Sequence, residues 1–199
     1  MWRAAGFGGL GTRHVLRLPL DVRRGVRPES IEPVLEKARA EGLDPFCLVG
    51  SACSTPMGAF DPLEPMGEIA ARHGLWFHVD GAHGASLLLS RRHRGLLRGI
   101  ERADSVTWDA HKMMFVPALC TFLLFRDGRR AYETFNQDAP YLYDLDAHPT
   151  RDFDALLRTV ESTRRPMVMP VFAHWAAFGP SLFEDLVDLA IGRAHELHA

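Results

Sequence analysis

Short apolar runs alternate with stretches of helical periodicity along most of this chain, and this alternation most limits the fold that it can adopt. Strands are predicted at 14–20, 46–49, 75–79, 105–108 and 121–125. Between them, apolar residues recur at helical spacing over 30–41 and 63–73, with a further helical patch over 85–98. Strands that alternate with helices in this way form βαβ units. We therefore predict an α/β fold, a mainly parallel sheet with flanking helices.

The pattern changes near residue 141, after which no further strand is predicted. Two helices are expected instead, over 169–179 and 181–199, separated by Gly179-Pro180. We therefore divide the chain into residues 1–140, the central part of a sheet domain, and residues 141–199, a helical C-terminal part.

Composition argues against several classes of function. The 199 residues are 47% hydrophobic and 24% charged, which is typical of a soluble globular protein. A net charge of −2 gives no reason to expect a nucleic acid or a membrane surface as a partner. Three cysteines without CxxC spacing predict neither a disulfide framework nor a zinc site, and we expect no metal. Because neither an apolar run of about 20 residues nor a signal peptide is recognised, we expect a cytoplasmic protein.

Two residues with distinctive chemistry follow predicted strands. Asp80 comes at the end of the strand at 75–79, and Lys112 comes shortly after the strand at 105–108. Ligands bind beyond the carboxyl ends of parallel strands, so both side chains are expected at that edge, beside the Ser/Thr-rich loop at 50–58. Pyridoxal phosphate (PLP) chemistry needs a lysine that forms a Schiff base and an aspartate that holds the pyridinium nitrogen. The pair therefore suggests a PLP enzyme.

Each of these residues also has a simpler interpretation. Lys112 precedes Met113-Met114, and weakly polar surroundings favour a neutral, nucleophilic amine, but the residue alone is more simply a surface lysine. Asp80 ends an apolar strand and needs a partner, which is either a pyridinium nitrogen or the N-terminus of a following helix. Ala82, on the same loop, is small enough for a flat ring to lie against it.

Three segments together resemble the PLP-dependent group II amino-acid decarboxylases, which include glutamate, aromatic amino-acid, diaminobutyrate and cysteine-sulfinate decarboxylases. The segments are SACSTPMGAFDPL (51–63), LWFHVDGAHGA (75–85) and GIERADSVTWDAHKMM (99–114). The resemblance implies the large domain of a fold-type I PLP enzyme, PLP as cofactor, an amino-acid substrate, release of CO2 and a homodimer. Spacing alone does not choose decarboxylation over the chemistry of an aminotransferase or an aldolase.

The resemblance also implies roles for individual residues. Lys112 would form the Schiff base and Asp80 would bind the pyridine nitrogen, and these two would be the catalytic residues. Ala82 would pack against the cofactor ring, while Thr55 and His111 would lie close to the cofactor.

The chain departs from the family pattern in its residues and in its length. Asp109 stands where asparagine is common, and His83 stands where tyrosine or phenylalanine is usual. Family members are much longer, with an upstream phosphate-binding loop, a stacking histidine and a C-terminal small domain. We therefore expect a truncated chain. Three explanations of the truncation stay open: a naturally short protein, a gene split by a frameshift and a wrong start codon. A catalytically silent fragment that pairs with a full-length subunit is an alternative, and it would expose an apolar patch.

Overall fold

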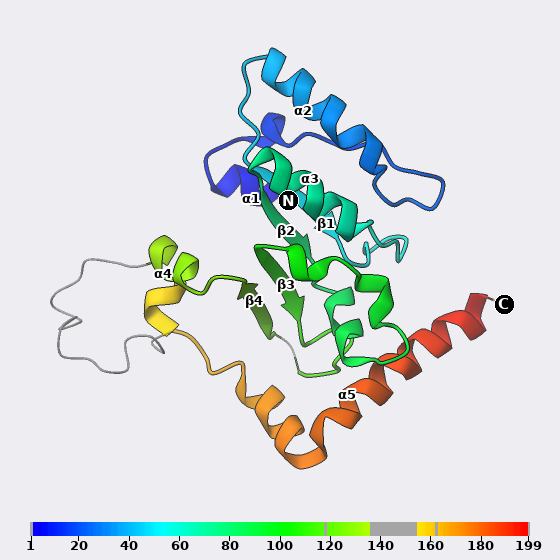
Figure 1. The fold of residues 1–199 in the computed structure, drawn as a ribbon. Coiled ribbons are helices and arrows are strands. Elements are labelled where there is room, and N and C mark those ends of the chain that lie inside the picture. Colours follow the sequence, from blue (N-terminus) through cyan, green and yellow to red (C-terminus); the bar gives the residue numbers. More distant parts are fainter. Residues whose placement is uncertain (1, 118, 136–154, 162, 199) are drawn as a thin grey trace, which may run out of the picture.

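The computed structural model describes residues 2–117, 119–135, 155–161 and 163–198, and at its centre is a sheet in the order β1-β2-β3-β4. β1 (Cys47–Ser51), β2 (Trp76–Asp80) and β3 (Ser105–Asp109) are parallel, whereas β4 (Thr121–Phe125) is antiparallel to β3. Figure 1 shows the arrowheads of the parallel strands at one edge of the sheet. The structure confirms the predicted α/β fold with a mainly parallel sheet.

Helices of two kinds surround the sheet. The α-helices of the described residues are α1 (Trp2–Phe7), α2 (Ile31–Ala40), α3 (Leu63–His73), α4 (Arg129–Phe135) and α5 (Met169–His198). The 3-10 helices are η1 (Thr12–His14), η2 (Pro28–Ser30), η3 (Gly84–Leu89), η4 (Arg94–Leu97), η5 (Ile100–Arg102) and η7 (Ala155–Arg158). α3 has the predicted bounds and ends because Gly74 adopts the left-handed conformation (φ 66°). The patch predicted as helical over 85–98 forms the 3-10 helices η3 and η4.

The hydrophobic core lies on one face of the sheet, because side chains alternate between the two faces along each strand. Phe77 and Val79 of β2 are buried in a cluster that also contains Leu63 of α3. Gly50 of β1 has to be small here, since a Cβ would lie 2.9 Å from Leu63 Cδ2. Val187, in the second half of α5, joins the same cluster, so the C-terminal helix completes the core.

The opposite face of the sheet carries a row of polar side chains that leads toward the strand ends. His78 Nδ1 lies 2.8 Å from Ser105 Oγ, and His78 Nε2 lies 3.3 Å from Thr107 Oγ1. Trp76 Nε1 donates a hydrogen bond to the same Ser105 hydroxyl (2.9 Å). Asp80 continues this row at the end of β2, because it lies two residues beyond His78.

One predicted strand is wrong and one predicted break is confirmed. Residues 14–20 form no strand, and only Leu20 makes an isolated antiparallel bridge, with Val26. Pro19 has no N–H to donate to a ladder, which explains why the apolar alternation there does not produce a strand. α5 is interrupted at the predicted position, since Gly179 has a non-helical backbone (φ 72°). The predicted boundary near residue 140 lies outside the described residues.

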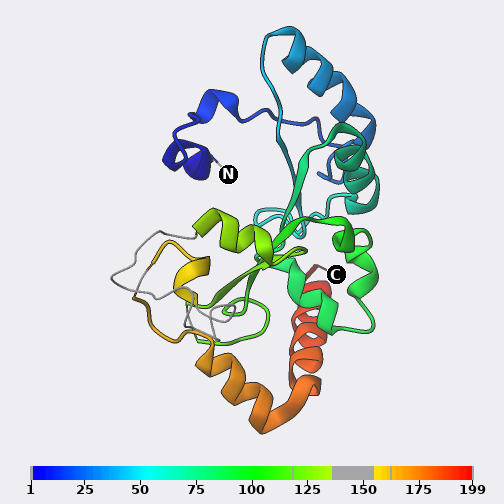
Figure 2. The same ribbon diagram turned by 60° about the vertical axis from the view of Figure 1, so that its left-hand side comes forward.

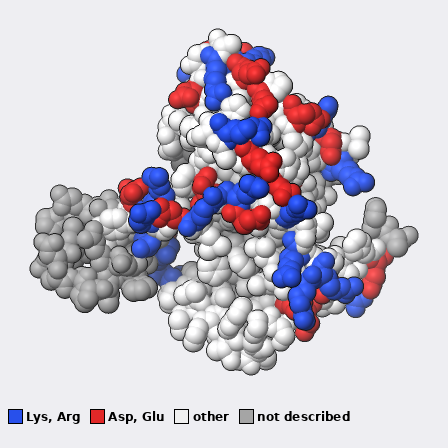
Figure 3. Space-filling model, viewed as in Figure 1, with Lys and Arg blue, Asp and Glu red and all other residues white. Residues whose placement is uncertain are grey.

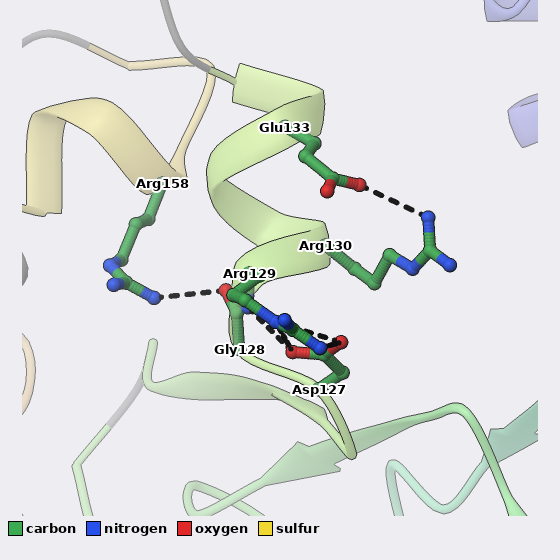
Figure 4. Close-up of polar contacts among 6 residues, drawn as sticks. All are labelled: Asp127, Gly128, Arg129, Arg130, Glu133 and Arg158. Carbon is green, nitrogen blue, oxygen red and sulfur yellow. Dashed lines mark hydrogen bonds and ion pairs between the residues drawn. The ribbon is translucent and has the colours of Figure 1, made fainter.

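Specific polar contacts attach the C-terminal part to the sheet domain. Arg158 of η7 donates a hydrogen bond to the carbonyl of Gly128 (3.1 Å), just before α4 (Figure 4). The second half of α5 packs against η3, where Ser90 Oγ donates to the carboxylate of Asp188 (Figure 2). Within the described ranges, no helix is both long and apolar enough to cross a membrane.

Candidate active site

The carboxyl ends of β1, β2 and β3 meet at the edge where the sequence places the site. Ser51, Asp80 and Thr107 are register partners across the three strands, so their backbones lie side by side. The N–H of Ala52 donates to the Asp80 carbonyl (2.8 Å), which holds the start of the following loop against the end of β2. The structure thus brings Asp80 and the Ser/Thr-rich loop together.

Asp80 presents an exposed carboxylate at this edge. Its Oδ1 accepts the N–H of Ala82 (3.2 Å), which forms a local turn after β2. Asp80 does not cap the next helix, because η3 has His83 at its N-cap and no capping hydrogen bond from a side chain. The apolar run that precedes Asp80 is buried through Phe77 and Val79, on the opposite face. The carboxylate is therefore accessible to a ligand and is not buried with the core.

The turn after β2 is packed tightly between its neighbours. The carbonyl of half-buried Ala82 accepts the N–H of Asp109 (3.1 Å), which joins the turn to the end of β3. On the other side, the N–H of Gly84 donates to the Ala52 carbonyl (3.0 Å). A Cβ on Gly84 would lie 2.4 Å from this carbonyl oxygen, so glycine allows the close approach. These contacts restrain the backbone on which Asp80 and Ala82 lie.

Lys112 lies on the turn after β3, and its amino group pairs with Asp109. The Nζ atom is 2.8 Å from Asp109 Oδ2, and the Lys112 N–H donates to the Asp109 carbonyl (3.2 Å). The Lys112 side chain is 34% exposed, whereas that of Asp109 is 11% exposed. The apolar neighbours Met113 and Met114 are buried, so the amine has a carboxylate counter-charge in place of the weakly polar setting expected from the sequence.

β4 and the loop that precedes it hold Asp109 from the other side. Thr121 Oγ1 donates to Asp109 Oδ1 (2.7 Å) across a register pair of the antiparallel ladder. His111 Nε2 lies 3.7 Å from Asp109 Oδ2, and His111 Nδ1 lies 3.1 Å from the backbone nitrogen of Cys120. Asp109 therefore lies at the centre of a cluster that joins β3, β4 and the Lys112 turn.

Burial and neighbouring charges shift several pKa values in this region. Partial burial acts to raise the pKa of Asp109, but the hydrogen bonds from Lys112 and Thr121 and the positive charge of Lys112 outweigh it and lower the pKa. Burial lowers the pKa of His83, and the nearby charge of Lys112 lowers it further. Burial is also the main cause of the lowered pKa of His78. At neutral pH, Asp109 is ionised and both histidines are uncharged.

Thr55 is not hydrogen-bonded to this cluster within the described residues. It is exposed on the loop between β1 and α3, which is closed by a hydrogen bond from the Gly58 N–H to the Ser54 carbonyl (2.8 Å). Within the part of the chain that the structure describes, no hydrogen bond or ion pair joins the Thr55 side chain to Lys112 or Asp80. Its predicted place near a cofactor is therefore not tested by a contact.

Sequence reasoning missed Thr121 and did not foresee that Asp109 pairs with Lys112. The spacing of three residues between Asp109 and Lys112 was an available signal, although it is informative only if the intervening residues form a tight turn. No local signal marks Thr121, because its position opposite Asp109 depends on the antiparallel pairing of β4 with β3.

The chemistry of these side chains fits the ring and aldehyde of PLP. The amine of Lys112 suits the aldehyde, and the exposed carboxylate of Asp80 suits the protonated pyridine nitrogen. Ala82 leaves space beside Asp80 on the same turn. A negative charge at position 109 would repel a nearby phosphate, but the Asp109 carboxylate is paired here with Lys112 and with Thr121.

Comparisons with known proteins assign the chain to a family. The model of the pyridoxal-dependent decarboxylase conserved domain matches residues 2–199. The acidic amino acid decarboxylase of Mus musculus is 38% identical over 198 residues, which cover 99% of this chain and 36% of the relative. The cysteine sulfinic acid decarboxylase of Mus musculus is 39% identical over 189 residues, which cover 94% of this chain and 38% of the relative.

A solved structure agrees with these matches. The crystal structure of mouse CSAD superposes with a TM-score of 0.91 and 37% identity, over 98% of this chain and 41% of that chain. The chain thus spans about two-fifths of the length of these relatives. The family's cofactor is PLP, and its members are carboxy-lyases with the fold-type I architecture. This chain belongs to the pyridoxal-dependent decarboxylases.

Proposed function

We propose that this chain forms the PLP-binding centre of an amino-acid decarboxylase, with Lys112 as the lysine that carries the cofactor as a Schiff base. The observation that carries the proposal is that the strand ends hold the Asp80 carboxylate and the Lys112 amine on connected turns, joined through the hydrogen bond from Asp109 to Ala82. Bound PLP would accept the electron pair that remains when the substrate loses CO2.

The chain's own residues would divide the work of holding the cofactor. Asp80 would keep a proton on the pyridine nitrogen, which maintains the electron demand of the ring. Ala82 would allow the ring to lie flat beside the turn, and His111 and Thr55 would contact the cofactor from the Lys112 turn and the β1–α3 loop. Lys112 would hold the cofactor through its amino group.

The proposed substrate is an amino acid with an acidic side chain. The names of both mammalian relatives refer to acidic substrates, and each relative is more than a third identical to this chain. By the same resemblance, we infer a cytoplasmic homodimer, in which a partner subunit would complete the substrate pocket. Decarboxylation is favoured over transamination and aldol chemistry because the matching family is one of decarboxylases.

A trapping experiment tests the cofactor site. The 199-residue chain is incubated with PLP and reduced with borohydride, and the modified peptides are identified by mass spectrometry. Only two lysines are present in the sequence, so Lys37, on the exposed side of α2, is an internal control for non-specific labelling. We expect the phosphopyridoxyl group on Lys112, and much less of it in an Asp80→Ala variant.

Equal labelling of Lys37 and Lys112, or no effect of Asp80→Ala, would contradict the proposed site. If Lys112 is labelled selectively, release of CO2 from glutamate, aspartate, cysteine sulfinate and tryptophan then tests the reaction. Release from tryptophan but from none of the acidic amino acids would overturn the proposed substrate class.

A second candidate is a catalytically silent chain that pairs with another subunit, and one observation favours it. Apolar residues on the first half of α5 are exposed: Met169, Phe172, Trp175 and Phe178. Figure 3 shows charged side chains of both signs over the upper part of the molecule and an almost uncharged area lower down, where this half of α5 lies. Selective trapping of PLP on Lys112 together with release of CO2 would exclude a catalytically silent chain. Self-association of the chain that the Phe172→Ser substitution abolishes would support pairing through α5.

A further inference from the structure

We propose that Asp109 is a positioning residue for Lys112: its carboxylate holds the amino group as an ammonium ion and so controls how readily this amine adds to an aldehyde. The inference rests on the proposed function, in which Lys112 is the amine that reacts with the cofactor. It assigns a role to a residue that sequence comparison marks only as a departure from asparagine.

The ion pair has unequal access to solvent on its two sides. The carboxylate of Asp109 is 11% exposed, whereas the Lys112 side chain is 34% exposed. An aldehyde can therefore reach the amine, while the counter-charge is shielded from water and salt, which strengthens the attraction. The hydrogen bond from the Lys112 N–H to the Asp109 carbonyl closes the turn that returns the side chain to its partner.

The two carboxylate oxygens have different partners, and this division orients the group. Thr121 donates to Oδ1 at 2.7 Å, which leaves Oδ2 directed at Lys112 at 2.8 Å. Asparagine at this position would retain the shape and could still meet both partners. It would not supply a negative charge, so the difference between aspartate and asparagine isolates the electrostatic contribution.

Other titratable groups face the pair from each neighbouring element. His111, on the same turn, lies 3.7 Å from Asp109 Oδ2. The thiol of Cys120, before β4, has its pKa raised by burial and then by the charge of Asp109. His83, on the turn after β2, has its pKa lowered by burial and then by the charge of Lys112. Lys112 Nζ lies closer to Asp109 Oδ2 (2.8 Å) than His111 Nε2 does (3.7 Å), so Lys112 is the main counter-charge of Asp109.

The addition step explains why this counter-charge matters. The ammonium group must release a proton before its lone pair can attack the carbonyl carbon. The new N–C bond forms as the C=O π bond opens, and loss of water then leaves a protonated C=N group. In total, ammonium and aldehyde give iminium and water, so the positive charge remains on nitrogen. A carboxylate that stabilises the starting ammonium makes this proton loss less favourable, so the amine reacts more slowly.

Reductive methylation measures this reactivity without the cofactor. The folded 199-residue chain is treated with formaldehyde and cyanoborohydride, which delivers hydride to the C=N carbon, from about pH 6 to about pH 10. Mass spectrometry follows the rate at Lys112 and at Lys37. Lys37 is an internal control, because its side chain is 79% exposed and its only ion-pair partner among the described residues, Glu41, is 3.9 Å away.

Removal of the charge should make Lys112 more reactive. In Asp109→Asn, we expect methylation of Lys112 near pH 8 to be about tenfold faster and its rate profile to move to lower pH, with Lys37 unchanged. Unchanged profiles at Lys112, or an equal change at Lys37, would overturn the proposal. If Asp109→Asn does not fold, Asp109→Ser removes the same charge and decides instead: faster methylation of Lys112 with Lys37 unchanged would support the proposal, and an unchanged rate at Lys112 would refute it.

This test is independent of the proposed PLP chemistry. Formaldehyde needs neither Asp80 nor a phosphate site, so a tenfold effect with no trapping of PLP would support the Asp109 proposal and contradict the cofactor proposal. Selective PLP trapping with no effect of Asp109→Asn would support the cofactor proposal and contradict the Asp109 proposal.

Discussion

Gly84→Ala should destabilise the chain by moving the two turns that frame the candidate site. Gly84 is buried, and its added Cβ would lie 2.4 Å from the Ala52 carbonyl oxygen and 2.7 Å from Cys53 Cβ. The first of these contacts is with backbone, so a side-chain rotation cannot relieve it. One turn has to move away from the other, although Ala52 is also bonded to the end of β2 through the Asp80 carbonyl (2.8 Å).

The size of the effect follows from three contributions. Overpacking in a buried position costs about 1–3 kcal/mol. Separation of the turns weakens the hydrogen bond from the Gly84 N–H to the Ala52 carbonyl, which contributes about 1 kcal/mol. Replacement of glycine by alanine also reduces the entropy of the unfolded chain, which offsets the loss by about 0.4–1 kcal/mol. The net decrease in the free energy of unfolding should therefore be about 1–3.5 kcal/mol.

Urea unfolding followed by circular dichroism measures this decrease, with Gly95→Ala as the matched control. Gly95 lies in η4, is exposed, and has no atom within 4 Å of the position that a Cβ would take. Its substitution should change the free energy of unfolding by less than about 0.5 kcal/mol. If Gly84→Ala were as stable as Gly95→Ala, the close packing of the two turns would be refuted.

Three further predictions, the first with a control substitution, test other parts of the structure by urea unfolding. Phe77→Ala should lower the free energy of unfolding by about 3–5 kcal/mol, because the Phe77 side chain is 1% exposed. The control Phe46→Ala, at a position that is 62% exposed, should lower it by less than about 0.5 kcal/mol, and similar values for the two variants would refute the core assignment. Asp61→Ala should lower the free energy of unfolding by about 1–3 kcal/mol, because its carboxylate accepts the backbone N–H groups of Val26 and of Ser51, at the end of β1, at 2.8 and 2.7 Å; a neutral result would contradict these bonds. The lowered pKa of Asp109 means that its carboxylate contributes stability above the ordinary value of 3.8 and loses it as the pH falls through the lowered pKa. The advantage of wild type over Asp109→Asn should thus be constant from about pH 7 to about pH 5 and shrink below about pH 4; an advantage that persists in acid would contradict this linkage.

Elements whose start and end are marked by nearby residues could be predicted from the sequence. Features that depend on pairing with a neighbouring strand could not. α3 was predicted with its bounds, because helical apolar spacing ends at Gly74, which has the left-handed conformation that favours glycine. The bounds of β4 were also predicted, but not its antiparallel direction, which its residues do not encode locally. Residues 14–20 have the alternation of a strand, but a strand needs a ladder, and Pro19 removes one of its donors.

The candidate site shows the same distinction between position and environment. Asp80 and Lys112 could be placed at the sheet edge because each follows an apolar run that had to become a parallel strand. Their environments could not be predicted: Asp80 is exposed, and Lys112 is paired with a carboxylate. Strand alternation explains the first, since His78 and Asp80 lie on the polar face. The second depends on a turn and on the neighbouring strand β4.

Asp109 and Thr121 therefore belong together as one functional unit. A buried carboxylate with an oxygen left unpaired is unfavourable, and the threonine hydroxyl satisfies the oxygen that Lys112 does not reach. The hydroxyl can do so only because β4 is antiparallel and places Thr121 opposite the last residue of β3. The reversed strand at the end of the sheet thus allows a charged residue at a position where the resemblance leads one to expect asparagine. That charge is next to the amine on which the proposed chemistry depends, so under the proposed role of Asp109 the direction of β4 would contribute to the reactivity of Lys112.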